Sequence, residues 1–224
     1  MSTFDVDLGH GLRAPARSET ERKLLEAGLA VFAAKGLHGA STSEIAERAD
    51  VRKSTLHYYF RRKEDLYAAV FDEAFRQLAA PLEERLSPEM GFAEVLRAWV
   101  EHHVGAFGAR PDVVRLWMHE NLIGAPVAVP LLRRLQGEPS SPYRMFVSSL
   151  ERAIEAGEVR AVDSRQTFVT VMGACLFFHV ARPTMVATLP SLTGRDDGFD
   201  GETFTAARAD HVLDVLWRGL RAPA

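Results

Sequence analysis

The sequence predicts an all-α protein. Strand-like alternation is nearly absent, apolar residues recur at helical spacing, and Gly and Pro divide the chain into helix-length segments. Hydrophobic residues make up 47% of the 224 residues and charged residues 25%, which is typical of a soluble globular protein. This length allows one large domain or a small domain joined to a larger one, and it is enough to bury a core.

Secretion and membrane spanning are not expected. The N-terminus lacks a basic region followed by an apolar run, as a signal peptide would have. The most apolar stretch, Phe168–Ala181, is shorter than the roughly 18 residues that span a bilayer. A single cysteine, Cys175, excludes an intramolecular disulfide and fits a reducing compartment. We therefore expect a cytoplasmic protein.

The N-terminal elements follow from capping residues and apolar spacing. Residues 1–16 are expected to form a disordered tail. A first helix is predicted from about Ser18 to Lys35, with Ser18 as N-cap, Glu21 as its capping-box partner, and Gly36 as the residue that ends it.

Shorter helices are predicted next. They cover 43–49 and 53–59, separated by three residues, and a long helix begins at Lys63 and runs to Leu86. Later breaks at Gly- and Pro-containing segments predict helices at about 89–108, 112–123, 127–136, 142–157, 163–189 and 202–221. The 163–189 helix is apolar nearly all round, so it should be buried on several sides.

Residues 41–66 carry the most informative pattern. Two short helices with a tight turn between them, flanked by longer helices, are typical of a helix-turn-helix, whose second helix enters the major groove of DNA. Ile45, Ala46, Leu56 and Phe60 can face inward. The outward residues of the second helix are hydrogen-bonding, cationic or aromatic, namely Arg52, Lys53, Ser54, Thr55, His57, Tyr58 and Tyr59. A bundle with a solvated basic face is the alternative, and the three adjacent rings at 57–59 disfavour it.

The charge distribution agrees with nucleic-acid binding at one end of the chain. Residues 13–65 carry 11 Lys and Arg against 8 Asp and Glu, and residues 51–63 carry five basic side chains and no acidic one. The remainder from residue 66 onward is net acidic. A basic N-terminal module on an acidic body is typical of a chain that meets a polyanion through one module.

This region resembles the DNA-binding domain of TetR-family transcriptional repressors over about residues 18–70. The residues that match the family pattern in register are Phe32, Lys35, Gly36, Thr42, Ile45, Ala46, Thr55, Leu56, Phe60, Lys63, Glu64 and Leu66. Asp50 stands where the family usually has Gly in the turn, and Asp tolerates the left-handed conformation better than most residues. His57 replaces the usual Tyr, and Arg52 and Arg62 replace small capping residues.

The resemblance implies two domains and their roles. A helix-turn-helix domain would cover 17–64, with the motif at about 41–60, and a helical effector-binding and dimerisation domain would cover 65–224. Within the first, Ser43, Lys53, Ser54 and His57 are expected near base edges, whereas Thr42, Thr55, Tyr58, Tyr59 and Lys63 are expected near phosphates. The implied partners are a palindromic double-stranded DNA operator, a second copy of the chain and a small-molecule effector.

Dimerisation would use the helices at 163–189 and 202–221 in a four-helix bundle, with an intrachain core as the alternative. Candidate effector contacts are aromatic, Met, His and Cys side chains at helical spacing, a pattern that plain core packing also produces. They are Trp99, His103, Phe107, Trp117, Met118, Tyr143, Phe146, Phe168, Met172 and Cys175.

Metal binding and catalysis are not expected. His102, His103, His119 and Glu120 do not form a His-Glu-x-x-His pattern, and adjacent helical histidines point about 100° apart. Cys175 and His179 are four residues apart on one helix, but apolar surroundings raise a thiol pKa. Serine-hydrolase, P-loop and dinucleotide-binding glycine patterns are absent, so no cofactor is expected. A second interpretation is a helix-turn-helix protein that serves a structural or partner-binding role without effector regulation.

Overall fold

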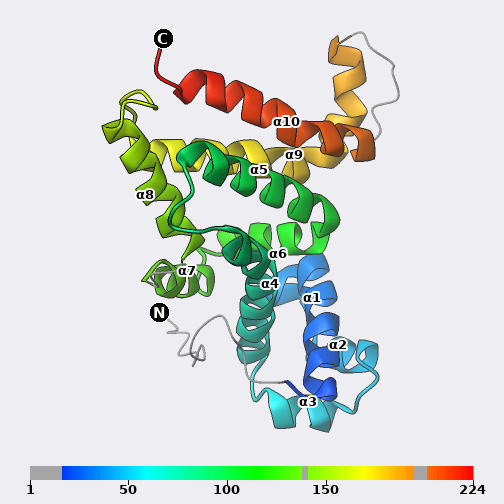
Figure 1. The fold of residues 1–224 in the computed structure, drawn as a ribbon. Helices are drawn as coiled ribbons and strands as arrows, with labels where there is room; N and C mark the ends of the chain where they lie inside the picture. Colours follow the sequence, from blue (N-terminus) through cyan, green and yellow to red (C-terminus); the bar gives the residue numbers. More distant parts are fainter. Residues whose placement is uncertain (1–16, 138–140, 194–200, 224) are drawn as a thin grey trace. The chain divides into compact units, whose positions relative to one another are not determined.

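The computed structural model describes residues 17–137, 141–193 and 201–223, and within these ranges the chain is helical (Figure 1). No strand is formed there, and the only bridge of β type joins Val159 to Arg221. The expectation of an all-α fold is confirmed. The tail expected at residues 1–16 lies outside the described residues.

The helices agree with the expected ranges to within about one turn. They are α1 (Glu19–Gly39), α2 (Thr42–Arg48), α3 (Lys53–Tyr59), α4 (Lys63–Arg85), α5 (Phe92–Ala109), α6 (Pro111–Leu122), α7 (Ala128–Gly137), α8 (Pro142–Glu155), α9 (Ser164–Thr193) and α10 (Gly201–Leu220). Gly36 has φ +66° inside α1, so the continuous part of that helix stops where the sequence predicted.

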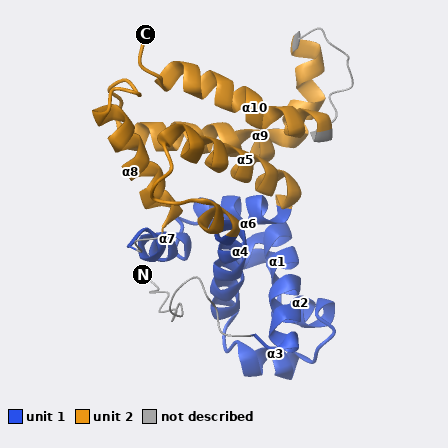
Figure 2. Cartoon of the chain, in the orientation of Figure 1, with its two compact units in different colours: residues 1–80, 112–138 blue, residues 81–111, 139–224 orange. Residues whose placement is uncertain are grey.

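The chain packs as two compact units (Figure 2). The first comprises residues 1–80 and 112–138, which contain α1 to α3, most of α4, and α6 and α7. The second comprises residues 81–111 and 139–224, with α5, α8, α9 and α10. The packing thus groups α6 and α7 with the N-terminal helices, a grouping that sequence order does not suggest. A functional boundary at residue 64 stays a prediction.

Close contact between α1 and α4 forms the centre of the first unit. The rings of Phe32 and Tyr67 meet edge to face at 5.0 Å, and both are fully buried. A Cβ atom at Gly28 would lie only 2.8 Å from Cγ2 of Val70. Glycine at this position therefore lets α1 approach α4.

A buried carboxylate connects α6 to α7. Oε1 of Glu120 accepts hydrogen bonds from the backbone N–H groups of Val127 at 2.5 Å and Ala128 at 2.8 Å, where α7 begins. An anion at a helix N-terminus is stabilised by unpaired N–H groups and by the helix dipole. Burial, followed by the negative charge of Glu120, raises the pKa of Tyr67. This acidic residue, weighed above as a metal ligand, thus caps a helix.

The second unit is organised around α5, which packs against α8, α9 and α10. Trp99 on α5, Phe146 on α8 and Val171 on α9 are fully buried. The opposite side of α9 is exposed, with 64% of Val169 and 62% of Phe177 accessible. The expectation that this helix is buried on several sides is therefore wrong for the single chain.

The segment Ser164–Leu192 of α9 is long and apolar enough to cross a membrane by length and composition alone, and 17% of its apolar window is buried. The apolar part is thus longer than the Phe168–Ala181 stretch considered above. Helices that line a subunit interface share this composition, so α9 by itself does not indicate a membrane protein.

Candidate DNA-binding site

The turn between α2 and α3 is built by one residue in a left-handed conformation. Asp50 has φ +54°, its N–H donates to the carbonyl of Glu47 at 3.0 Å, and the N–H of Val51 donates to the carbonyl of Ala46 at 3.0 Å. These two bonds form a Schellman motif, which ends α2 and redirects the chain into α3. Asp50 adopts the conformation for which the family's usual glycine is suited.

The packing of the two short helices confirms the predicted inward set. Ile45 and Leu56 are fully buried, and Ala46, Ala49 and Phe60 are nearly so. The small side chains on α2 allow the helices to cross closely. The remaining face of α3 is thereby left to solvent.

The outward face of α3 presents side chains with uncommitted hydrogen-bonding groups. Lys53, Ser54 and His57 are exposed, and within the described part of the chain their side chains make neither a hydrogen bond nor an ion pair. Tyr58 is 83% exposed, and its ring lies 5.4 Å from that of Tyr59. A surface of this kind can reach base edges and phosphates without breaking internal contacts.

Several other predicted contact residues lie at the edge of this face. On α2, Ser43 is exposed and Thr42 is half-buried, and Thr55 on α3 is half-buried. Tyr59 is also half-buried, and its hydroxyl accepts a hydrogen bond from Ser18 Oγ at 3.1 Å, which connects α3 to the start of α1. The hydroxyl of Tyr59, predicted to lie near a phosphate, thus already has a partner within the protein.

Two basic side chains at the start of α4, Arg62 and Lys63, already have partners within the protein. Nζ of Lys63 donates to the carbonyl of Ala40 at 3.0 Å and to that of His38 at 3.4 Å. The guanidinium of Arg62 pairs with Asp65 at 2.8 Å and holds the pKa of that carboxyl below its usual range. Lys63 retains one further N–H donor, because an ammonium group has three.

Unpaired cations extend the candidate interface beyond the predicted residues. The side chains of Arg48, Arg52 and Arg61 are exposed and make no ion pair within the described ranges. Arg48 and Arg61 were absent from the predicted contacts, although the basic run at 51–63 already included Arg61. With Lys53 they concentrate positive charge around α3, as phosphate binding requires.

Seven of the ten predicted effector contacts meet in the second unit. Trp99 stacks on His103 at 4.7 Å and lies 5.2 to 5.6 Å from the rings of Phe146, Tyr143 and Phe168. Its Nε1 donates to Sδ of Met172 at 3.2 Å, and Phe107 lies 5.4 Å from His103. We call these seven residues the aromatic cluster.

The other three predicted contacts lie elsewhere. Cys175 is buried on α9, and burial raises the pKa of its thiol to about 12. Trp117 and Met118 belong to the first unit, where Trp117 stacks against Phe71 at 6.1 Å and Phe75 at 5.2 Å. The structure therefore gives Trp117 a packing role beside α4.

Burial sets the protonation of the polar members of the aromatic cluster. Nδ1 of His103 lies 2.9 Å from the carbonyl of Trp99, to which it donates, and burial lowers the pKa of His103 to about 4. Burial also raises the pKa of Tyr143 to about 12. At neutral pH the cluster is therefore uncharged.

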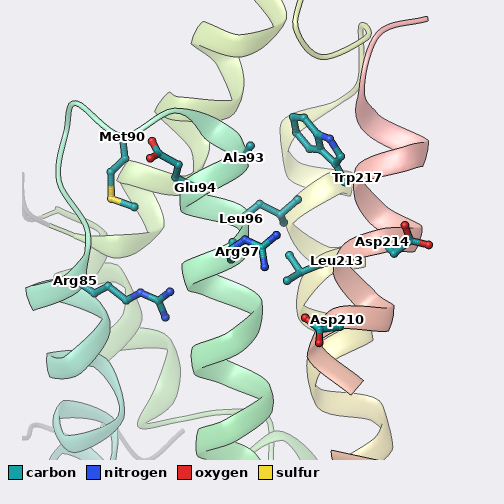
Figure 3. A pocket seen from close by; sticks show the side chains of 10 residues that line it. All are labelled: Arg85, Met90, Ala93, Glu94, Leu96, Arg97, Asp210, Leu213, Asp214 and Trp217. Carbon is teal, nitrogen blue, oxygen red and sulfur yellow. The ribbon is translucent and has the colours of Figure 1, made fainter. Parts of the chain in front are cut away.

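A groove of about 550 Å³ opens elsewhere in the second unit, between the α4–α5 connection, α5 and α10 (Figure 3). Its wall on α10 carries Asp210, Leu213, Asp214 and Trp217, and the facing wall includes Arg97 and Leu96. None of the ten predicted effector contacts lines it. Within the described ranges, no group of three or more His, Cys, Asp or Glu residues could hold a metal ion.

Comparison with known proteins agrees with this architecture. Residues 24–70 match the family model described as "Bacterial regulatory proteins, tetR family", and residues 93–215 match "Tetracyclin repressor-like, C-terminal domain". The chain is 27% identical over 214 residues to the regulator RutR of Escherichia coli K12, which covers 94% of this chain and 95% of RutR. It is 37% identical over 173 residues to the transcriptional activator FasR of Mycolicibacterium smegmatis, covering 77% and 78%.

Solved structures share the fold. The ketosteroid regulator KstR2 of Mycobacterium tuberculosis superposes with a TM-score of 0.68 at 17% identity, covering 95% of this chain and all of that chain. FadR of Bacillus subtilis, solved with stearoyl-CoA, has a TM-score of 0.64 at 20% identity, covering 88% and 98%. With both family models matched in order along its length, the chain belongs to the TetR family, whose members are DNA-binding transcriptional regulators and not enzymes.

Proposed function

We propose that this protein is a cytoplasmic homodimeric repressor that binds a palindromic operator and is released from it by a small-molecule effector. The observation that carries the proposal is the outward face of α3. Lys53, Ser54 and His57 there are exposed and have no internal partner within the described residues. In a helix-turn-helix this face enters the major groove, so these side chains can read base pairs.

The exposed side of α9 supports a dimer. Val169 and Phe177 lie on α9 with most of their surface accessible, and Val215 on α10 is 56% exposed. Gly173, between Val169 and Phe177, is exposed and would meet nothing within 4 Å if it carried a Cβ atom. Apolar surface of this kind needs a cover, and the same face of a second copy provides one with two-fold symmetry.

A dimer also supplies the DNA affinity that a single helix-turn-helix domain, here called a head, lacks. A single helix-turn-helix covers too few base pairs for a useful specificity, whereas two heads about 34–36 Å apart read two half-sites of an inverted repeat. The operator is therefore proposed to be palindromic.

The aromatic cluster supports effector binding. The cluster is uncharged and rich in aromatic rings, a composition that it shares with sites for apolar small molecules. The name of one relative agrees with an apolar effector: the fatty acid metabolism regulator protein of Bacillus subtilis is 30% identical to this chain over 81 residues, which are 36% of this chain. An effector that prefers the DNA-free state by about 1 to 3 kcal/mol weakens operator binding roughly 5- to 150-fold.

The experiment that tests the proposal is selection of bound sites from a random duplex pool, carried out at two salt concentrations. Enrichment of an inverted repeat is the expected result. Salt-sensitive binding without any enriched sequence would favour a structural or partner-binding helix-turn-helix protein instead. Failure to bind at either salt concentration would remove α3 as a DNA-reading helix.

The direction of regulation needs a second measurement, because relatives include a repressor from Streptomyces coelicolor as well as the activator FasR. A reporter gene placed behind the selected operator should be expressed at a lower level when the protein is present. A higher level would make the protein an activator and contradict repression without affecting operator binding.

A further inference from the structure

A polar cluster lies between α9 and α10 in the second unit, and it contains a cation that pairs with no anion in the described part of the chain. One terminal nitrogen of Arg208 donates to the carbonyl of Ala174 at 3.0 Å. Its Nε is buried and has no acceptor, and no carboxylate pairs with Arg208 among the residues that the structure describes. A half-buried guanidinium left in this state is costly, because its charge is partly desolvated.

His179 adds a second unsatisfied nitrogen. Its Nε2 atom is buried and makes no hydrogen bond within the described part of the chain. Burial, Arg182 and Arg208 together lower the pKa of His179, so the ring is neutral at physiological pH. The ring can then donate or accept one hydrogen bond at Nε2, depending on its tautomer.

No negative charge is available from the nearby thiol. Cys175 precedes His179 by one turn of α9, and burial raises its pKa to about 12 in spite of the positive charge of Arg208. Among the residues that the structure describes, the cluster therefore combines positive charge with unsatisfied hydrogen-bonding groups and contains no anion.

Ring contacts connect this polar cluster to the aromatic cluster. The ring of His179 lies 6.2 Å from that of Phe107, which in turn lies 5.4 Å from His103, beside Trp99. An uncharged, apolar region is thus continuous with a cationic end. Such an arrangement complements a molecule that has an apolar body and an anionic head.

We propose that Arg208 and His179 bind the carboxylate of an organic acid whose apolar part packs against the aromatic cluster. The inference rests on the proposed function in taking this acid to be the effector. A guanidinium binds a carboxylate through paired N–H donors, and the unpartnered Nε of Arg208 is one such donor. His179, as the tautomer protonated at Nε2, donates a further hydrogen bond.

The test is binding of matched acids and alcohols to the full chain, measured by calorimetry. The probes are hexanoate, decanoate and 4-phenylbutyrate, each compared with the alcohol of the same skeleton. At least one acid is expected to bind roughly tenfold or more tightly than its alcohol, since a hydrogen bond to a charged group contributes about that factor. Equal binding of acids and alcohols, or no binding of any acid, would overturn the proposal.

Three variants identify the residues. Arg208→Gln should abolish the preference for the acid, and Arg208→Lys should retain part of it because the charge remains. Arg218→Gln is the matched control, since Arg218 lies on the same helix, is exposed, and pairs with Asp214 at 2.7 Å. Thermal melting establishes that each variant is folded. An Arg208→Gln protein that still prefers the acid would refute the role of Arg208.

Two further measurements distinguish the acid-binding site from the proposed dimer and from the proposed release of the operator. If Arg208 instead pairs with a carboxylate of a second copy, Arg208→Gln will dissociate the dimer in light scattering while leaving acid binding unchanged, which contradicts the proposal. Operator affinity is measured with and without the acid that binds. Acid binding without an effect on the operator would support the site and contradict effector release. Operator binding without binding of any acid would overturn the site and leave the proposed DNA binding intact.

Discussion

The ammonium group of Lys63 donates a hydrogen bond to the backbone carbonyl of Ala40 at 3.0 Å, and so joins the start of α4 to the segment that connects α1 to α2. The same side chain was expected at a phosphate. Since an ammonium has three N–H donors and two of them bind the carbonyls of Ala40 and His38, one donor remains for DNA. Lys63 thus contributes both to the packing of the helix-turn-helix domain and to its positive charge.

Replacing Lys63 with Ala should therefore change stability and DNA affinity together. The free energy of unfolding should fall by about 1 kcal/mol. Affinity should fall about equally for all DNA sequences, and the slope of log affinity against log salt should decrease by about one. Lys35→Ala is the control, because Lys35 is already paired with Glu44 at 2.7 Å. An unchanged salt slope for Lys63→Ala would restrict this residue to a structural role.

His57→Ala should alter which base pairs are preferred. The ring is exposed on α3 and free of internal bonds in the described chain, so its loss should change specificity at one position by about 1 to 3 kcal/mol with little effect on stability. Repeating the site selection with this variant measures the change. The same enriched repeat at unchanged strength would remove His57 from the reading residues.

Substitutions at Asp50 should report the strain of the turn. Because its φ is +54°, Asp50→Gly should raise the free energy of unfolding by up to about 1 kcal/mol, whereas Asp50→Ala should lower it. Urea denaturation of both variants measures the two changes. A destabilised glycine variant would show that the carboxylate makes a compensating contribution to the turn.

Burial of His103 should make stability fall in acid. Its folded-state pKa of about 4 lies below the ordinary value of 6.5, so the unfolded chain takes up a proton first as the pH is lowered. This contribution is complete above about pH 6.5 and is lost between there and pH 4, with a maximum of about 3 kcal/mol. Denaturation of the wild type and of His103→Phe across this range should show a smaller pH dependence in the variant. If the wild type and the variant lose stability equally as the pH falls, the low pKa of His103 would be contradicted.

A charge on the exposed face of α9 should disrupt the proposed dimer. Phe177→Glu should yield a folded monomer with weaker operator binding, measured by light scattering and by DNA titration, because a buried unpaired carboxylate is unfavourable. The matched control is Leu122→Glu on α6, where the side chain is 79% exposed in the first unit. A dimeric Phe177→Glu protein would place the interface on another face.

Local features of this fold could be predicted because they depend on neighbours in sequence. The helix that begins after Ser18, the left-handed turn at Asp50 and the inward positions of Ile45 and Leu56 follow from capping, backbone sterics and periodicity over a few residues. Ile45 and Leu56 are also among the residues that match the TetR-family pattern. The outward residues of α3 were therefore identifiable without coordinates.

Contacts between distant segments were decided by the tertiary structure. Only folding places Trp117 against Phe71 and lets Glu120 cap α7, because each contact joins residues that periodicity does not relate. The apolar character of α9 likewise predicts that the helix is buried, but it does not show which segments cover it. In the single chain one side of α9 stays exposed. The sequence by itself determined the helices and the outward face of α3, which we propose reads DNA, because both arise from local interactions. The three-dimensional fold determined the packing units and the unsatisfied Arg208–His179 cluster, since these depend on which surfaces meet across long stretches of chain.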